Sequence, residues 1–247
     1  MKKEYNLKSI IAGLVILICG IGMVLLEVFL IRTPQNLWIS IGCSLIASAI
    51  VILVNAWLVE RKEVNPLEKW KISKIYKRRS EKSADSDPKI KKVKNNLDVV
   101  AFGLKSFREN HSADIQKCLN NGTIIRILTM SPNSIFVSQR EKEENETEGQ
   151  IKNTINGLIE WAKDINAKVK KTKNSKKAGH IEIRGYDCMT LDFYWRMDNE
   201  LYVGPYWYGM SSQQTITYKF DEGGEGFKDY TDYFEKIWRS AEGNVLL

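Results

Sequence analysis

Histidine and cysteine are scarce in this sequence of 247 residues, which has 2 His and 4 Cys. Cys19 and Cys43 fall within long apolar runs, Cys118 and Cys188 are far apart, and no pair has the C-x-x-C spacing of a structural zinc site. We therefore expect no metal site and no disulfide framework. The sequence also lacks a Walker A loop, an H-E-x-x-H pair and a G-x-S-x-G elbow. We predict no bound cofactor.

Two long apolar runs open the chain, at residues 9–31 and 37–59. As a helix, a run of about 23 residues spans roughly 34 Å, which is enough to cross the hydrocarbon core of a bilayer. Lysines precede the first run and a basic segment follows the second, whereas only Arg32 lies between them. The positive-inside rule therefore places both termini in the cytoplasm. We predict a two-span hairpin in the cell membrane over residues 1–60, with the lipid bilayer as its partner.

Two polar residues interrupt these runs. Glu27 lies near the outer end of the first run, and a carboxylate inside a membrane is costly. It is either solvated or paired with Arg32, or it lines a pore or a contact between helices. Asn55, near the cytoplasmic end of the second run, either bonds across helices or is solvated at the interface. Small residues in both runs permit close packing, either of the two spans of one molecule or of copies in a homo-oligomer.

The formal charge of +7 is concentrated in residues 61–94, which have thirteen Lys and Arg against five Asp and Glu. Such residues beside a membrane are attracted to anionic headgroups by about 1 kcal/mol each. We predict a basic juxtamembrane linker over residues 61–94, beginning as an amphipathic helix and then loosening. Residues 95–247 have a net charge of −2, which gives no strong signal for nucleic-acid binding.

Strand and helix signals alternate after the linker. Periodic apolar residues predict helices at residues 105–119, 135–169 and 227–238. The first helix lies between two strand-like runs, which indicates a βαβ unit with parallel strands. We predict one cytoplasmic α/β domain at residues 95–247, a sheet with helices on its faces. The predicted strands are residues 97–103, 123–130, 180–186, 193–197, 201–206 and 215–220.

The segments LDVVAFG, TIIRILTMSPNS, HIEIRGYD, RMDNELYVGPYWYG and DYFEKIW, in this order, resemble the soluble domain of phospholipase D-like proteins, particularly a divergent bacterial group. The resemblance implies an α/β/α domain. Active members carry HxKxxxxD, in which His is the nucleophile and Lys binds the phosphate. If Asp198 takes the Asp position, Phe193 and Leu191 stand where Lys and His would be, so both catalytic residues are absent. Gly204-Pro205 replaces the family's Gly-Ser.

Charged and aromatic residues near the ends of the predicted strands are our candidates for a ligand site. Arg184, Arg196 and Asp198 lie where α/β sheets place ligands. Tyr206 and Trp207 belong to an aromatic run that can stack on a base or a headgroup. Surface salt bridges and core packing explain the same residues without a ligand. The ligand that we expect is a small phosphorylated molecule or a nucleotide.

Lost catalytic residues in a retained fold indicate a membrane-anchored cytoplasmic sensor or regulatory protein rather than an enzyme. Bacterial anti-phage membrane effectors offer an analogy, in which ligand binding assembles the spans of a hairpin. The alternative is a membrane-bound phosphodiesterase, nuclease or phospholipase with a rearranged active site around Asp198, Arg196 or His180. A scaffold that binds another protein is a third interpretation.

Overall fold

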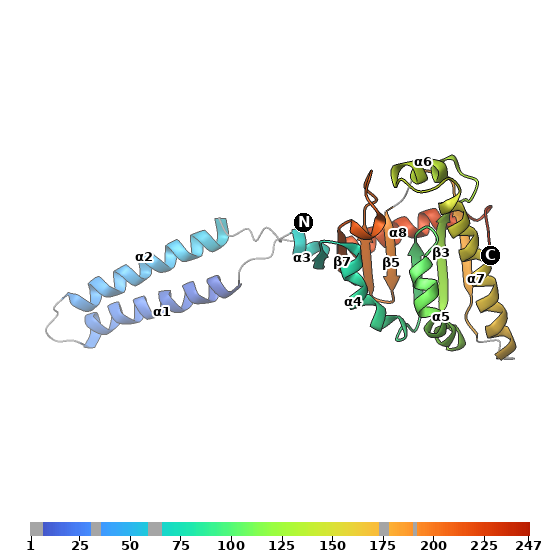
Figure 1. Ribbon diagram of the computed structural model, residues 1–247. Coiled ribbons are helices and arrows are strands. Elements are labelled where there is room, and N and C mark those ends of the chain that lie inside the picture. The colour runs from blue at the N-terminus through green and yellow to red at the C-terminus, as the bar shows by residue number, and fades with distance from the viewer. Residues whose placement is uncertain (1–6, 31–35, 59–65, 173–177, 190–191) are drawn as a thin grey trace. The chain divides into compact units, whose positions relative to one another are not determined.

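The computed structural model describes residues 7–30, 36–58, 66–172, 178–189 and 192–247 (Figure 1). The chain divides into two compact units, Met1–Pro66 and Leu67–Leu247. Some residues on which the sequence arguments depend lie outside the described ranges: Arg32 between the apolar runs, the first basic residues of the linker at 61–65, and Leu191 at the position of the family's nucleophile.

The first unit contains two helices, α1 (Leu7–Leu30) and α2 (Leu37–Leu58), which lie antiparallel along each other. Both are long and apolar enough to span a membrane. Only 11% of each apolar window is buried, so most of the apolar side chains face outward, unlike those of a core helix in a soluble domain. These features are compatible with the predicted hairpin.

Small residues spaced by seven form the interface between α1 and α2, as in a coiled coil. Gly20 on α1 faces Gly42 on α2, and a Cβ atom at Gly20 would lie 2.9 Å from the carbonyl oxygen of Gly42. Ala49 and Ala56 continue the row on α2 and are buried. The small residues therefore pack the two spans of one molecule together, whereas assembly of several copies stays a prediction.

Glu27 lies in the same interface and is 1% exposed. Its Oε2 atom accepts a hydrogen bond of 2.7 Å from the backbone N–H of Ile39, in the first turn of α2. Such N–H groups have no partner within their own helix, so Glu27 caps α2 from α1. This is a contact between helices, one of the two roles considered for it. Asn55 is exposed on α2 and does not lie between the helices.

The second unit is built on a seven-stranded sheet with the order β1-β7-β6-β5-β2-β3-β4. β2, β3 and β4 are parallel, and the predicted βαβ unit is confirmed by the pairing of Asn96 with Ile124. The other neighbours are antiparallel. The strands are β1 (Ile72–Tyr76), β2 (Asn96–Val100), β3 (Ile124–Met130), β4 (Ile181–Tyr186), β5 (Phe193–Met197), β6 (Glu200–Gly204) and β7 (Thr217–Asp221).

Helices cover both faces of this sheet (Figure 1), which confirms the predicted α/β class. One apolar core lies between the sheet and α4, α5 and α7, and a second lies between the sheet and α8. The predicted helix at 135–169 is two helices, because the backbone between them has a positive φ at Asn145 and Gly149. The carboxylate of Glu141 accepts backbone N–H groups at the start of α7. The helices are α3 (Pro66–Trp70), α4 (Arg79–Ile90), α5 (Lys105–Asn120), α6 (Ile135–Glu143), α7 (Gln150–Thr172), the short 3-10 helix η1 (Ser212–Gln214) and α8 (Glu225–Ser240).

The prediction of a linker at residues 61–94 was wrong for residues 67–94, which belong to the domain. β1 pairs with β7 at the edge of the sheet, and α4 packs on the sheet. The basic residues here are not all free to meet lipid headgroups. Lys89, for example, pairs with Asp85 at 2.9 Å and with Glu200 of β6 at 2.8 Å.

Candidate functional site

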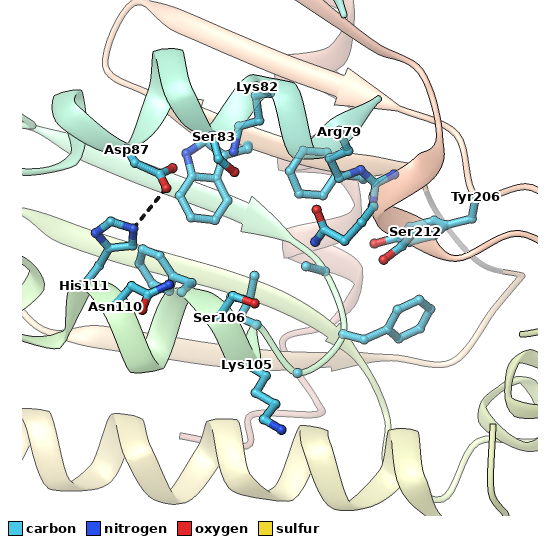
Figure 2. A pocket seen from close by; sticks show the side chains of 18 residues that line it. Arg79, Lys82, Ser83, Asp87, Lys105, Ser106, Asn110, His111, Tyr206 and Ser212 are labelled. Carbon is cyan, nitrogen blue, oxygen red and sulfur yellow. Dashed lines mark ion pairs between the residues drawn. The ribbon is translucent and has the colours of Figure 1, made fainter. Parts of the chain in front are cut away.

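A cavity of about 390 Å³ lies at the edge of the sheet where β2 ends and β5 begins (Figure 2). α4 forms one wall, the start of α5 forms the opposite wall, and the loop after β6 closes one end. α/β sheets place ligands at the carboxyl ends of their parallel strands. The volume also falls within the range of about 300 to 1,000 Å³ that is usual for small-molecule sites.

The turn from β2 into α5 brings a helix N-terminus to this cavity. The first N–H groups of a helix have no partner inside it, and they carry the positive end of the helix dipole. Leu104 precedes α5 with a φ of 49° and gives no side-chain cap, and the first turn has no acidic residue. Gly103 is required in this turn, since a Cβ atom there would lie 2.0 Å from the side chain of Thr154. The positive end of α5 is therefore not neutralised by its own residues.

Arg79, in the first turn of α4, lies at one end of the cavity and is 4% exposed. Its Nη2 atom donates to the carbonyl of Pro205 at 3.1 Å and to the hydroxyl of Thr215 at 2.9 Å. The guanidinium carbon lies 4.2 Å from the ring centroid of Phe193 and 4.8 Å from that of Tyr206. Burial lowers the pKa of Arg79, but an arginine stays charged at pH 7. Its Nε is buried with no hydrogen-bond partner in the described part of the chain.

Lys82 lies one turn further along α4 and is 5% exposed. Its Nζ atom is 4.1 Å from the ring centroid of Trp195, with the rings of Phe193 and Tyr202 at 5.3 and 5.5 Å. Burial lowers the pKa of Lys82 to about 7, against the opposing field of Asp87. Among the described residues no carboxylate lies within ion-pair distance of this ammonium group. At neutral pH the side chain is therefore divided between its charged and neutral forms.

A histidine and a carboxylate close the other end of the cavity. His111 of α5 faces Asp87 of α4, with 3.3 Å between Nε2 and Oδ2 (Figure 2). Hydroxyl and amide groups line the space between the two ends, from Ser83, Ser106 and Asn110. Within the described ranges, no three His, Cys, Asp or Glu side chains come together as metal ligands would.

Two of the five predicted ligand residues lie at this cavity or beside it. Tyr206 lines the cavity, and its ring lies between two guanidinium groups, with Arg79 at 4.8 Å and Arg140 at 5.2 Å. Trp207 is 45% exposed, and its carbonyl oxygen accepts a hydrogen bond from Arg140 of α6. The loop that carries both residues is thus attached to α6.

The other three predicted ligand residues do not line the cavity. Arg184 of β4 donates a hydrogen bond to a carbonyl in the last turn of α8. Arg196 of β5 faces the buried Asp98 at 3.5 Å. Asp198 accepts the backbone N–H groups of residues 94–96, at the opposite edge of the sheet where β2 begins. Each has partners within the fold.

Sequence reasoning missed the four ionisable groups that shape the cavity, which are Arg79, Lys82, Asp87 and His111. The first three lie in the segment that was interpreted as a linker, and a lone histidine in a helix is more often structural. The spacing of the polar residues in this segment gave one signal that could have indicated the cavity wall. Positions 79, 82, 83 and 87 fall on one face of a helix, so their side chains meet a common surface.

No family model matches the chain, and no curated protein matches it. Among solved structures, TrmBL2, an archaeal chromatin protein whose structure shows a novel mode of DNA binding, is similar over 82% of this chain, with 14% identity and a TM-score of 0.41. The chain spans 63% of the length of that protein. NucT from Helicobacter pylori is similar over 68% of this chain and 95% of its own length, with 9% identity and a TM-score of 0.38. Likenesses this distant do not assign the chain to a family.

Proposed function

We propose that this protein is a membrane-anchored sensor whose cytoplasmic domain binds a small phosphorylated ligand in the cavity between α4 and α5. The observation that carries the proposal is the pair of cations Arg79 and Lys82, both at least 95% buried and both without an ion-pair partner among the described residues. A buried charge without a partner is costly. A phosphate between these groups would offset that cost.

Three kinds of donor at the cavity suit a phosphate. Arg79 supplies a guanidinium group, whose planar N–H groups match phosphate oxygens. Lys82 supplies an amine that takes up a proton, and so becomes an ammonium group, when an anion binds beside it. The N-terminus of α5 supplies backbone N–H groups and a favourable dipole. The positive groups around the cavity therefore exceed what the lining carboxylate of Asp87 neutralises, and a dianionic phosphate would balance them.

The resemblance to phospholipase D-like proteins supports the same place. Phe193 stands at the position of that family's phosphate-binding lysine, and it lies in the cavity wall beneath Arg79. A phosphate at this position would meet cations from α4 instead of a lysine from β5. The domain we propose keeps the family's phosphate site and has lost its nucleophile.

The hairpin α1–α2 is the proposed anchor in the cell membrane, with both termini in the cytoplasm, and the proposed output. α4, which carries both cations, follows the hairpin in the sequence, and between them the described residues form α3 and β1. A ligand that draws α4 towards α5 would move the segment that leads to the membrane. Assembly of hairpins from several copies, as in anti-phage effectors, is the response that we propose.

The test is a thermal-shift screen of the full-length protein in detergent, with inorganic phosphate, mononucleotides, cyclic nucleotides and phospholipid headgroups as probes. A ligand at about 100 times its Kd stabilises by about 2.7 kcal/mol, which raises the Tm by about 5 °C or more in a protein of this size. We expect such a shift with a phosphate-bearing probe that is recovered unchanged. Failure of every phosphate compound to stabilise the wild-type protein would refute the proposal.

Hydrolysis of a phosphodiester is the second candidate function, and one observation favours it. The His111–Asp87 pair lies in the same cavity as Arg79 and Lys82, whereas Asp198, Arg196 and His180 do not line it. Product analysis of the same samples separates the two functions. Cleavage of the probe, lost in His111→Gln, would establish an enzyme in place of a sensor.

A further inference from the structure

Lys82 has surroundings unlike those of two partly buried lysines nearby, Lys89 and Lys219. Lys89 lies within 3.1 Å of carboxylate oxygens of Asp85 and Glu200, and Lys219 lies 2.9 Å from Glu200. The Nζ atom of Lys82 is instead surrounded by the aromatic rings of β5 and β6 and faces the cavity wall. No hydrogen bond to it is found in the described ranges.

The faces of these rings attract the ammonium ion, whereas burial of Lys82 favours the neutral amine. An aromatic wall removes water from the charged form, and the guanidinium of Arg79, one turn away on the same helix, opposes a second positive charge. Asp87, also on α4, acts in the opposite direction, and its carboxylate is shared with His111 of α5. On β6 the nearest ionisable group is the hydroxyl of Tyr202, which is bound to Glu200. A desolvated lysine beside another cation is a known way to make an amine nucleophilic.

We infer that Lys82 is a reactive amine that forms an imine with small carbonyl compounds that carry an acidic group. Nζ attacks the carbonyl carbon of an aldehyde and forms a carbinolamine. The carbinolamine then loses one water molecule as the C=N bond forms. The step needs neither oxidant nor reductant, and hydrolysis of the imine reverses it.

Arg79 determines which carbonyl compounds react fastest. Its guanidinium carbon and Nζ of Lys82 lie 4.2 and 5.3 Å from the centroid of the same ring, that of Phe193. Because both residues also line the same cavity, one small molecule can pair its acidic group with Arg79 while its carbonyl carbon reaches Lys82. A carboxylate held in this way is presented to the amine instead of finding it by diffusion.

An imine at Lys82 goes beyond the proposed sensor function and does not require it. The ammonium form of Lys82 binds a phosphate, whereas the neutral amine reacts with an aldehyde. The two activities share the cavity and compete for it, but each has its own readout.

The experiment compares 4-carboxybenzaldehyde with benzaldehyde as probes of the full-length protein in detergent. Each reaction is stopped with sodium borohydride, which reduces the imine to a stable secondary amine, and the modified lysines are located by peptide mass spectrometry. Lys105 is the internal reference, because it also lines the cavity but points towards α7 and is exposed (Figure 2). An ordinary lysine, with a pKa of about 10.4, has only about one amine in a thousand unprotonated at pH 7.4. We therefore expect Lys82 to be modified at least about tenfold faster than Lys105.

Two variants test the assignment. Lys82→Met keeps an unbranched apolar chain and removes the amine, so the fast modification disappears, while Lys105→Met retains it. In Arg79→Gln the advantage of 4-carboxybenzaldehyde over benzaldehyde disappears. Modification spread evenly over the lysines, or an unmodified Lys82, would overturn the inference. If Lys82 is unmodified and a phosphate compound still raises the Tm, only the imine is refuted; if Lys82 is modified and no phosphate compound stabilises the protein, only the sensor is refuted.

Discussion

The guanidinium group of Arg79 lies over the ring of Phe193, with 4.2 Å between the guanidinium carbon and the ring centroid. The two residues come from different parts of the chain, since Arg79 begins α4 and Phe193 begins β5. The cation at this place in the cavity therefore comes from α4, and the ring beneath it comes from β5. The cavity can therefore attract an anion although its strands contribute aromatic rings and no charge.

Replacing Arg79 by methionine should weaken binding of the phosphate probe without unfolding the protein. Methionine keeps an apolar chain over Phe193 and removes a buried cation that has no carboxylate partner among the described residues. Loss of a hydrogen bond to a charged group costs about 1.5–3 kcal/mol, so we expect the Kd to rise about tenfold to a hundredfold. Calorimetric titration of the full-length protein measures the Kd.

Arg184→Met is the matched control, because Arg184 is a largely buried arginine that stacks on an aromatic ring as Arg79 does, but it lies on β4 beneath α8, outside the cavity. It should bind the probe like the wild type. Equal Kd values for the wild type and Arg79→Met would show that the cavity does not use this cation.

Most of the sheet could be predicted from the sequence, whereas the wall that carries the site could not. β2, β3 and β4 are runs of β-branched residues, and α7 has apolar residues at three-to-four spacing, so pattern and burial agree. α4 has the sequence RSEKSADSDPKI, and Ile90 is its one large apolar residue. Its inner face is made of Arg79, Lys82 and Ser86, whose types normally indicate a solvated surface.

The type of a predicted ligand residue does not tell whether it lies at the cavity. The sequence does not distinguish a charged side chain that pairs within the fold, as Arg196 does with Asp98, from one that binds a ligand. Tyr206 lines the cavity, and its role as a ligand residue stays a prediction. The cavity lies where the end of β2 meets the start of β5, and this pairing of distant strands is not visible in the sequence.

Asp85 should make the free energy of unfolding depend on pH in the acidic range. A hydrogen bond from Tyr76 lowers the pKa of Asp85 from 3.8 to about 2, with help from Lys89. A carboxyl group whose pKa is lower in the folded state contributes stability above pH 3.8, and this contribution is lost as the pH falls towards 2. Because water screens the partly exposed Asp85, its contribution is smaller than the size of the shift alone would give.

The measurement is the free energy of unfolding in urea at several pH values between 2 and 6, for wild type and Asp85→Asn. The difference between the two should shrink as the pH falls through this window. Asp232→Asn, which breaks an exposed pair with Lys228 on α8, should show little difference at any pH. A constant difference for Asp85→Asn would mean that its carboxylate does not stabilise the fold.

Lys82 should make the stability depend on pH in the same direction, but in the alkaline range. Its pKa is about 7 in the folded protein, against 10.5 for a lysine exposed to water as in the unfolded chain, so the unfolded chain binds more protons between these values. The free energy of unfolding therefore rises as the pH rises from 7 to 10.5, because the cost of burying Lys82 disappears as the unfolded chain loses its proton. We expect Lys82→Met to be more stable than the wild type at pH 7, and this advantage to shrink towards pH 10.5. Urea unfolding at these two pH values checks it, and an advantage that does not change with pH would contradict an amine of low pKa.

Glu27 should hold the first turn of α2 in place from across the hairpin. Its carboxylate accepts the N–H of Ile39 at 2.7 Å, which no residue within α2 can satisfy. In Glu27→Ala this N–H loses its partner, and loss of a helix cap costs about 1 kcal/mol. Hydrogen exchange of the full-length protein in detergent should therefore become about fivefold faster in the first turn of α2, since about 1 kcal/mol corresponds to that factor.

Two further variants separate capping from a general effect on the hairpin. Glu27→Gln keeps an acceptor oxygen at the same place, so exchange in the first turn should stay near the wild-type rate. Ser44→Ala changes an exposed residue of α2 whose hydroxyl bonds only to the carbonyl of Ser40 among the described residues, and it should leave the first turn unchanged. If Glu27→Ala leaves that exchange rate unchanged, the hydrogen bond from Ile39 to Glu27 does not hold the first turn of α2.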